Sequence, residues 1–294
     1  KREVKIDFDD MIHNAITAVK QNSRENNVQY EHILVDEFQD LSVSTLKLIK
    51  LITGQDKANL FCVGDDWQSI YGFRGATVET FVDFEEHFSP VVKTFMTTNY
   101  RSQKEIIDAA NELISNNEKQ ISKDVESKKP STNDIKLHRI SEEAGVKPDF
   151  VPPNYKKLVA KNTGKLVDDW LEDGVEPNEI MILSRMGADA SNVMAETQNE
   201  LERRGVPYEN KNGIQYYPGQ SKNNDMTAED NGSDELNVVS AYSIHQAKGE
   251  EARKVMILNA TTHWDGIPSE YTSSNDRLLE PTREKLVDDT EEER

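Results

Sequence analysis

Short runs of apolar residues, each followed by polar residues, set the pattern of the first hundred positions. Residues 32–35 and 59–63 are two such runs, and an unbroken apolar run of this length is typical of a parallel strand buried on both faces. Between them, residues 44–53 place apolar side chains at helical spacing. The order strand, helix, strand predicts a βαβ unit, and therefore a parallel sheet covered by helices.

The same alternation recurs after residue 100. We expect helices over residues 102–116, 155–172 and 188–204, and strands over residues 179–184, 237–244 and 254–259. Ser102 followed by Glu105 predicts a capping box at the first of these helices. Residues 219–235 contain almost no apolar side chains and indicate a flexible linker. The chain is therefore predicted to be α/β, with βα elements in two sets.

Composition narrows the class of protein. The 294 residues include 54 acidic and 35 basic side chains, a formal net charge of −19, which at first sight argues against a nucleic-acid partner. No apolar run is long enough to cross a membrane. The single cysteine, Cys62, excludes a disulfide framework and a cysteine-based zinc site. We expect Cys62 to be a buried, inert thiol in an intracellular, cytoplasmic protein.

Two adjacent carboxylates, Asp36 and Glu37, follow the first apolar run. Ligands of open α/β sheets bind at the carboxyl ends of the strands, and such a pair there forms a Walker B arrangement. In that role Asp36 holds Mg²⁺, and Glu37 orients or deprotonates the attacking water. The alternative is a strand that ends in a solvated acidic turn, which an isolated Asp-Glu pair would favour.

Longer strings around this pair and further along the chain resemble motifs of superfamily 1 helicases of the UvrD/Rep type. The matching strings are residues 7–11 (DFDDM), 35–40 (VDEFQD), 63–76 (VGDDWQSIYGFRGA), 99–102 (NYRS), 243–249 (SIHQAKG) and 264–269 (WDGIPS). They occur in the order of the family. Trp67 and the form of the fifth motif, SIHQAKG, resemble the helicase IV branch.

This resemblance implies two RecA-like parallel-sheet domains of a P-loop NTPase helicase core. Residues 1–95 would be the later part of a first, incomplete domain. Residues 96–294 would be most of the second, with the linker 219–235 in place of a large insertion. No G-x-x-x-x-G-K-[ST] string occurs, and neither does the sixth motif of the family. We therefore expect an internal piece of a larger helicase that alone hydrolyses ATP poorly.

The resemblance also implies roles at an ATP site. Gln68 would contact the γ-phosphate, while Arg74 and Arg101 would stabilise charge on the transferred phosphoryl group, Arg101 as the arginine finger of the second domain. Tyr100 would stack on adenine and Glu251 would reach the nucleotide sugar. The alternatives are an exposed turn residue for Gln68, surface ion pairs for the arginines and packing for Tyr100.

One position departs from the motif at this site. The family usually has leucine where this chain has Glu250, directly before Glu251. The role of Glu251 is therefore less firmly implied than the others.

For DNA, the resemblance implies stacking of single-stranded bases on Tyr71 and Phe73, a contact worth about 1–3 kcal/mol per base and tolerant of sequence. Packing of one or both rings in the core is the alternative. His245 and Lys248 would contact the DNA backbone or the domain interface. The net charge does not exclude this partner, because binding needs only a local basic and aromatic groove.

The function implied is that of an ATP-dependent DNA helicase or translocase that uses ATP and Mg²⁺. It would move 3′ to 5′ on single-stranded DNA, or on DNA with a 3′ tail, without sequence preference, in DNA repair or recombination. Proteins of a repair complex are candidate partners. Two alternatives stay open: a catalytically inactive helicase-like binding module, and the helicase part of a nuclease–helicase repair complex.

Overall fold

The computed structural model describes residues 6–21, 30–132, 135–138, 154–185, 193–210, 213–216, 218 and 237–258. These residues form two compact units. Unit 1 contains the described residues up to Ile135, and unit 2 contains those from Lys136 onward. The expected division between residues 95 and 96 concerns the RecA-like domains of the family and stays a prediction.

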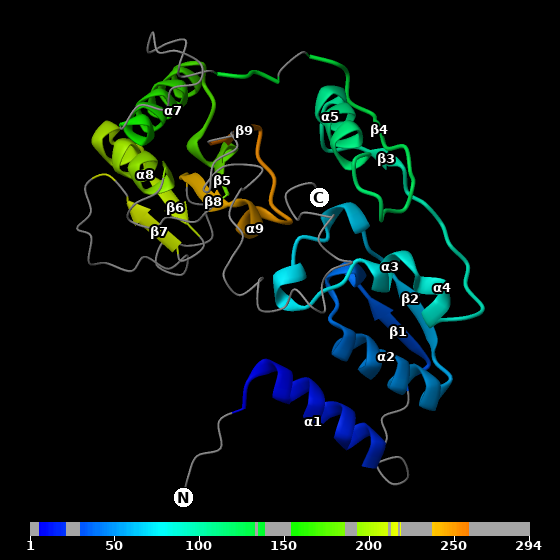
Figure 1. The fold of residues 1–294 in the computed structure, drawn as a ribbon. Helices are drawn as coiled ribbons and strands as arrows, with labels where there is room; N and C mark the ends of the chain where they lie inside the picture. Colours follow the sequence, from blue (N-terminus) through cyan, green and yellow to red (C-terminus); the bar gives the residue numbers. More distant parts are fainter. Residues whose placement is uncertain are drawn as a thin grey trace, which may run out of the picture. The chain divides into compact units, whose positions relative to one another are not determined.

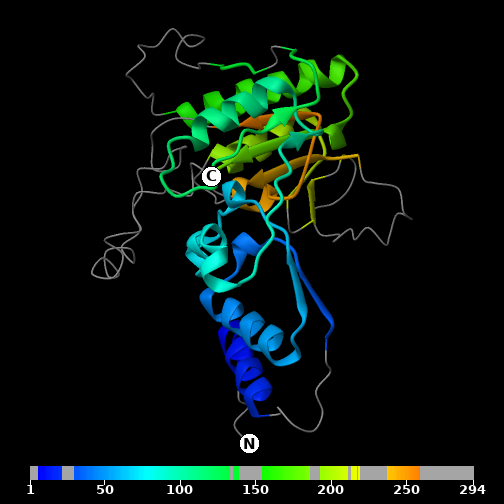
Figure 2. The ribbon, with the colours of Figure 1, turned by 90° about the vertical axis from the view of Figure 1, so that its right-hand side faces the viewer.

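Unit 1 contains the predicted βαβ unit. Strands β1 (His32–Val35) and β2 (Asn59–Cys62) pair in parallel in Figure 1, with Val35 opposite Cys62. Between them lies α2 (Val43–Asp56), whose N-cap Ser42 accepts a hydrogen bond from the backbone N–H of Thr45. Helix α1 (Phe8–Gln21) packs along α2, as Figures 1 and 2 both show. The prediction of a parallel pair joined by a helix is confirmed.

The prediction that these two strands are buried on both faces is wrong. Leu34 is 74% exposed and Phe61 is 62% exposed, while their neighbours Ile33 and Leu60 are half-buried. Successive side chains of a strand point to opposite faces, so one face of the pair packs and the other faces solvent. Cys62 is accordingly half-buried, not buried, although burial still raises the pKa of its thiol to about 12.

The rest of unit 1 consists of short elements. These are the 3₁₀ turns η1 (Phe38–Asp40), η2 (Asp66–Gln68) and η3 (Gly72–Arg74), the helices α3 (Glu79–Val82), α4 (Phe84–His87) and α5 (Lys104–Ile114), and the strands β3 (Thr98–Asn99) and β4 (Glu126–Ser127). The core around η1 is aromatic: the fully buried ring of Phe38 lies 5.2 Å from Phe84 and 6.1 Å from Phe81, centroid to centroid.

Helix α5 begins without the predicted capping box. Its N-cap is Gln103, which makes no side-chain capping bond. Instead, Asn99 at the end of β3 accepts hydrogen bonds at its Oδ1 from the backbone N–H groups of Arg101 (2.9 Å) and Ser102 (2.8 Å). The side chain that orders this turn therefore lies before the helix, because asparagine bonds readily to backbone N–H groups two and three residues on.

Unit 2 is built on a five-stranded sheet with the order β7-β6-β8-β5-β9. Its strands are β5 (Ile180–Ser184), β6 (Tyr208–Asn210), β7 (Gly213–Tyr216), β8 (Val239–Ser243) and β9 (Lys254–Ile257). Neighbouring strands are parallel except β6 and β7, which form an antiparallel pair that the sequence pattern did not predict. Its helical elements are α7 (Tyr155–Glu172), η4 (Pro177–Glu179), α8 (Val193–Arg204) and α9 (Ile244–Ala247).

The core of unit 2 lies between this sheet and the helices α7 and α8, which pack side by side in Figure 1. Ile180 and Ile182 of the central strand β5 are fully buried and meet Val167 of α7 and Leu201 of α8 in one cluster. The predicted strand 179–184 is thus confirmed as the buried central strand β5. The predicted linker 219–235, the string at 264–269 and the start of the helix expected from residue 188 lie outside the described residues.

Candidate ATP and DNA site

The two candidate Walker B carboxylates, Asp36 and Glu37, stand at the carboxyl end of β1 with both side chains exposed. The backbone N–H of Glu37 donates to Asp36 Oδ1 at 2.9 Å. Glu37 has φ 49° and ψ 45°, in the left-handed region. A side chain other than glycine is uncommon in that conformation, and such outliers concentrate at functional sites. The two carboxylates therefore lie just beyond the carboxyl end of β1, which is the edge where α/β sheets bind ligands.

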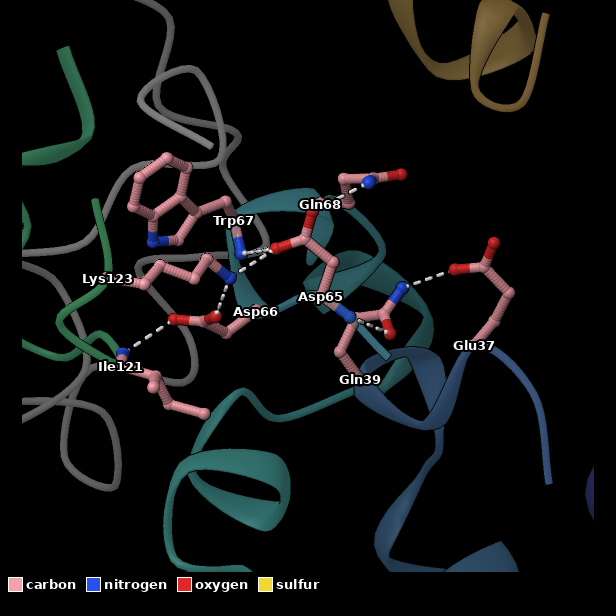
Figure 3. Close-up of polar contacts among 8 residues, drawn as sticks. All are labelled: Glu37, Gln39, Asp65, Asp66, Trp67, Gln68, Ile121 and Lys123. Carbon is pink, nitrogen blue, oxygen red and sulfur yellow. Dashed lines mark hydrogen bonds and ion pairs between the residues drawn. The ribbon is translucent and has the colours of Figure 1, made fainter. Parts of the chain in front are cut away.

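Gln39 joins these carboxylates to the neighbouring strand. Its amide is fully buried: Nε2 donates to Glu37 Oε2 at 2.6 Å, and Oε1 accepts the backbone N–H of Asp65 at 3.0 Å (Figure 3). Gly64 leaves the room for this amide, because a Cβ at that position would lie 2.6 Å from Gln39 Oε1. One side chain therefore fixes the positions of Glu37 and of the loop after β2 together.

Gln68 lies on that loop and is exposed. Its Nε2 donates to Asp65 Oδ2 at 2.7 Å, as Figure 3 shows. Asp65 thus donates its backbone N–H to Gln39 and accepts a hydrogen bond from Gln68 at its carboxylate. The structure brings the candidate γ-phosphate contact and the candidate catalytic carboxylate into one hydrogen-bonded group.

A lysine far along the chain completes this group. Lys123 Nζ lies 2.6 Å from Asp65 Oδ1 and 2.7 Å from Asp66 Oδ1, and 4.7 Å from the centroid of the Trp67 ring. Asp66 is fully buried, and its Oδ2 accepts the backbone N–H of Ile121 at 2.7 Å (Figure 3). No sequence motif pointed to Lys123, since its partners are more than fifty positions away. Gln39 and Asp65 lie inside motif strings but were not singled out.

The two candidate base-stacking rings lie together on the next turn of the same loop. The rings of Tyr71 and Phe73 meet edge to face with centroids 6.1 Å apart. The Arg74 guanidinium lies over both, 4.9 Å from the Tyr71 centroid and 5.4 Å from the Phe73 centroid. Phe73 is 61% exposed and Tyr71 is half-buried. An exposed ring beside a guanidinium is a surface on which a nucleic-acid base can stack.

Arg101 and Tyr100 follow β3, on the two-stranded pair β3–β4 of unit 1, and both side chains are exposed. Tyr100 is thus presented to solvent and not packed in a core. The structure does not place either residue in the hydrogen-bonded group of Figure 3.

The remaining predicted site residues lie in unit 2. His245 is in α9, Lys248 is the C-cap of that helix, and Glu251 follows two residues after Gly249, which has φ 85°. Ser243 and Gln246 form a capping box at the start of α9. All three candidates therefore follow the carboxyl end of β8, the edge of a parallel sheet where ligands bind.

The residues at the end of β1 suit Mg²⁺ and a nucleotide. Mg²⁺ is usually held through one or two carboxylates together with phosphates and water, and the exposed carboxylate of Asp36 offers this kind of ligand. Among the described residues, no group of three or more His, Cys, Asp or Glu side chains could by itself hold a metal. The donor set thus fits an ion shared with phosphates.

Among the residues that the structure describes, no helix is long and apolar enough to cross a membrane.

Comparison with protein families gives two adjoining matches. Residues 1–89 match the UvrD/REP helicase N-terminal domain, and residues 94–222 match the UvrD-like helicase C-terminal domain. Together the two matches extend over most of both units.

Individual relatives agree with these families. Over 221 residues, the chain is 31% identical to the ATP-dependent DNA helicase PcrA of Staphylococcus epidermidis. The aligned segment covers 74% of this chain and 28% of the relative. Over 214 residues, the chain is 29% identical to a probable DNA helicase II homolog of Mycoplasma capricolum. This aligned segment covers 72% of the chain and 27% of the relative. The chain therefore spans little more than a quarter of the length of these relatives.

Proposed function

Because the chain belongs to the UvrD/Rep helicase family, we propose that it is part of an ATP-dependent DNA helicase or translocase. The observation that carries this proposal is the continuous loop from Asp65 to Arg74. One end of the loop carries Gln68, which is linked to Glu37 by hydrogen bonds through Asp65 and Gln39. The other end carries the rings of Tyr71 and Phe73. A single segment thus offers contacts to a phosphate and to DNA bases.

At the nucleotide, each residue has a separate task. Asp36 would hold Mg²⁺, which supplies charge neutralisation of the phosphates, and Glu37 would take the proton of the attacking water. Gln68 would contact the γ-phosphate. Arg74 and Arg101 would stabilise the charge that develops on the transferred phosphoryl group, a task suited to a permanently charged guanidinium.

Contacts to the rest of the nucleotide are assigned by motif position. Tyr100 would stack on adenine, which its exposed ring permits, and Glu251 would bind the sugar. Both assignments depend on the prediction that residues 96–294 belong to the second RecA-like domain.

On DNA, Phe73 and Tyr71 would stack on bases, with His245 and Lys248 near the backbone of the strand. Stacking reads no sequence, so binding would be independent of sequence. By the same family assignment, movement would run 3′ to 5′ on single-stranded DNA, and a role in repair or recombination stays a prediction.

Substitution of Gln68 in the complete protein tests the proposal. The assay uses the complete protein because the chain contains no G-x-x-x-x-G-K-[ST] string, and we expect the chain alone to hydrolyse ATP poorly. ATP turnover is measured with and without single-stranded DNA. The wild type is expected to be stimulated by DNA, and Gln68→Ala is expected to lose that stimulation.

The matched control is Asn116→Ala, which removes an exposed amide elsewhere in unit 1 and should leave stimulation intact. A wild-type protein that does not hydrolyse ATP, or a Gln68→Ala variant with full stimulation, would contradict the proposal.

A further inference from the structure

Lys123 is the cation among the residues drawn in Figure 3. Its side chain is 13% exposed and lies between two carboxylates and an indole face. Removing an ammonium from water is unfavourable unless the partners are close and well oriented, and here both carboxylate oxygens lie within 2.7 Å. Such an arrangement fixes the geometry of whatever its partners hold.

The partner that matters for chemistry is Asp65. Lys123 engages Oδ1 of this carboxylate, and the Gln68 amide engages Oδ2. The carboxylate of Asp65 is one-third exposed, and Oδ1 also accepts the backbone N–H of Trp67 at 3.2 Å, so the ammonium and this N–H together fix its direction. The Gln68 amide donates to this carboxylate. The ammonium, which holds the other carboxylate oxygen, therefore also influences the direction of the amide.

Asp66 binds both Lys123 and the backbone of the segment before β4. Its buried carboxylate binds Lys123 at one oxygen and the N–H of Ile121 at the other. Three residues after Lys123, the chain enters the β3–β4 ladder: the N–H of Glu126 donates to the carbonyl of Thr97 at 2.8 Å. Arg101 lies two residues after the end of β3. The loop that carries Gln68 is thereby tied to the strand pair that carries Arg101.

We propose that Lys123 is a positioning residue for ATP hydrolysis, which orients Gln68 through the carboxylate of Asp65. This inference rests on the proposed function. Lys123 itself touches neither nucleotide nor DNA in this account. Its effect passes through Gln68, so its loss should have no consequence once Gln68 is absent.

A double-mutant cycle in the complete protein tests this dependence. Lys123→Met is expected to lower kcat for DNA-stimulated ATP hydrolysis about 10- to 100-fold, the range usual for groups that orient a reacting group from behind, with KM for ATP changed less than about threefold. On a Gln68→Ala background the same substitution is expected to lower kcat less than about twofold, because coupled positions are not additive.

The matched control is Lys119→Met. Lys119 lies four residues earlier and pairs with Glu79 of α3, 2.7 Å away, outside the Gln68 group. Its removal should leave kcat unchanged. Thermal melting of each variant reports folding separately from kinetics.

Folding needs its own variant, since Lys123→Met removes the ammonium that pairs with the buried carboxylate of Asp66. Lys123→Met/Asp66→Asn removes both buried charges and keeps an oxygen for the Ile121 N–H. If Lys123→Met alone melts at lower temperature, the cycle is run with this pair, and the same loss of kcat is expected.

The outcomes separate the two proposals. An inactive wild-type protein overturns the proposed function, and the role of Lys123 with it. An active wild type with unchanged kcat in the Lys123 variants, or equal losses with and without Gln68, overturns the positioning role alone. A loss of kcat confined to proteins that retain Gln68 supports it.

Discussion

The two units use parallel strands in different ways. In unit 2 the strand β5 has neighbours on both sides and is buried along nearly its whole length, with Ile180 and Ile182 in one apolar cluster. In unit 1, β1 and β2 form a sheet of two strands in which every second side chain is exposed. Unit 2 is therefore stabilised mainly by apolar burial. Unit 1 depends more on specific polar contacts at the ends of its strands.

The difference bears on where chemistry can occur. The candidate catalytic residues of unit 1 are held by Gln39, which bonds Glu37 and Asp65, and by Lys123, which pairs with Asp65 and Asp66. Buried polar networks fix geometry closely when complete and are expensive when one member is lost. An apolar core tolerates change in a graded way. Substitutions in the two units should therefore have different consequences.

The largest difference is expected for one large aliphatic residue of each strand type. Ile182→Ala in β5 should lower the free energy of unfolding by about 2–5 kcal/mol, because it empties a fully buried site. Leu34→Ala in β1 should cost less than about 1 kcal/mol, since the side chain is already in solvent. Urea unfolding monitored by circular dichroism measures both. Equal costs would show that β1 is covered in solution.

A smaller effect is expected from two glycines of unit 1. Gly64→Ala should destabilise the protein by about 1–3 kcal/mol, because the new Cβ would overlap the Gln39 amide and the Phe81 ring. Gly54→Ala in α2 meets nothing within 4 Å and should stabilise it by about 0.5–1 kcal/mol. Thermal melting compares them. A neutral Gly64→Ala would mean that the Gln39 bridge is looser than the structure has it.

Exposed aromatic rings of unit 1 allow a test of DNA binding. Phe73→Ala should weaken binding of single-stranded oligonucleotides by about 1–3 kcal/mol, the usual value of one stacked base. Phe61→Ala removes a ring of nearly equal exposure that lies in β2, away from Arg74, and should leave binding unchanged. Fluorescence anisotropy on the complete protein measures both. Equal losses would indicate a nonspecific apolar contact.

A further effect concerns the half-buried thiol of β2. Burial raises the pKa of Cys62 from 9.0 to about 12, so at pH 8 its thiolate should be roughly 1000-fold scarcer than in the unfolded chain. Because the folded pKa is the higher one, its contribution to stability is complete below pH 9 and is lost as the pH rises towards 12. Alkylation by iodoacetamide in native buffer and in urea measures the ratio. Similar rates would contradict burial of the thiol.

The pattern of apolar residues was sufficient for several of the regular elements. It predicted β1, α2 and β2 as a parallel unit, and the predicted helix 155–172 coincides with α7. It could not tell a two-stranded sheet from the interior of a larger one, because Leu34 and Phe61 are as apolar as Ile182. The antiparallel pair β6–β7 escaped notice because Glu209 and Asn210 give one strand little apolar character.

The candidate site was predictable where contacts are local. Asp36, Glu37 and Gln68 were identified from their strings, and the structure links Glu37 to Gln68 through Gln39 and Asp65. The contacts of Lys123 were not predictable, since its partners Asp65 and Asp66 lie more than fifty positions earlier in the chain. A single lysine in a polar stretch has no periodicity or motif to mark it.

We propose that the carboxyl ends of β1 and β2 in unit 1 carry the ATP chemistry. Glu37→Gln in the complete protein tests it most directly, because the change removes the proton acceptor and keeps the shape of the side chain. We predict that kcat for ATP hydrolysis with single-stranded DNA falls by at least about 100-fold. ATP binding and melting temperature should match the wild type, and Glu112→Gln, an exposed carboxylate of α5, should keep full activity. Retention of wild-type kcat by Glu37→Gln would contradict the account.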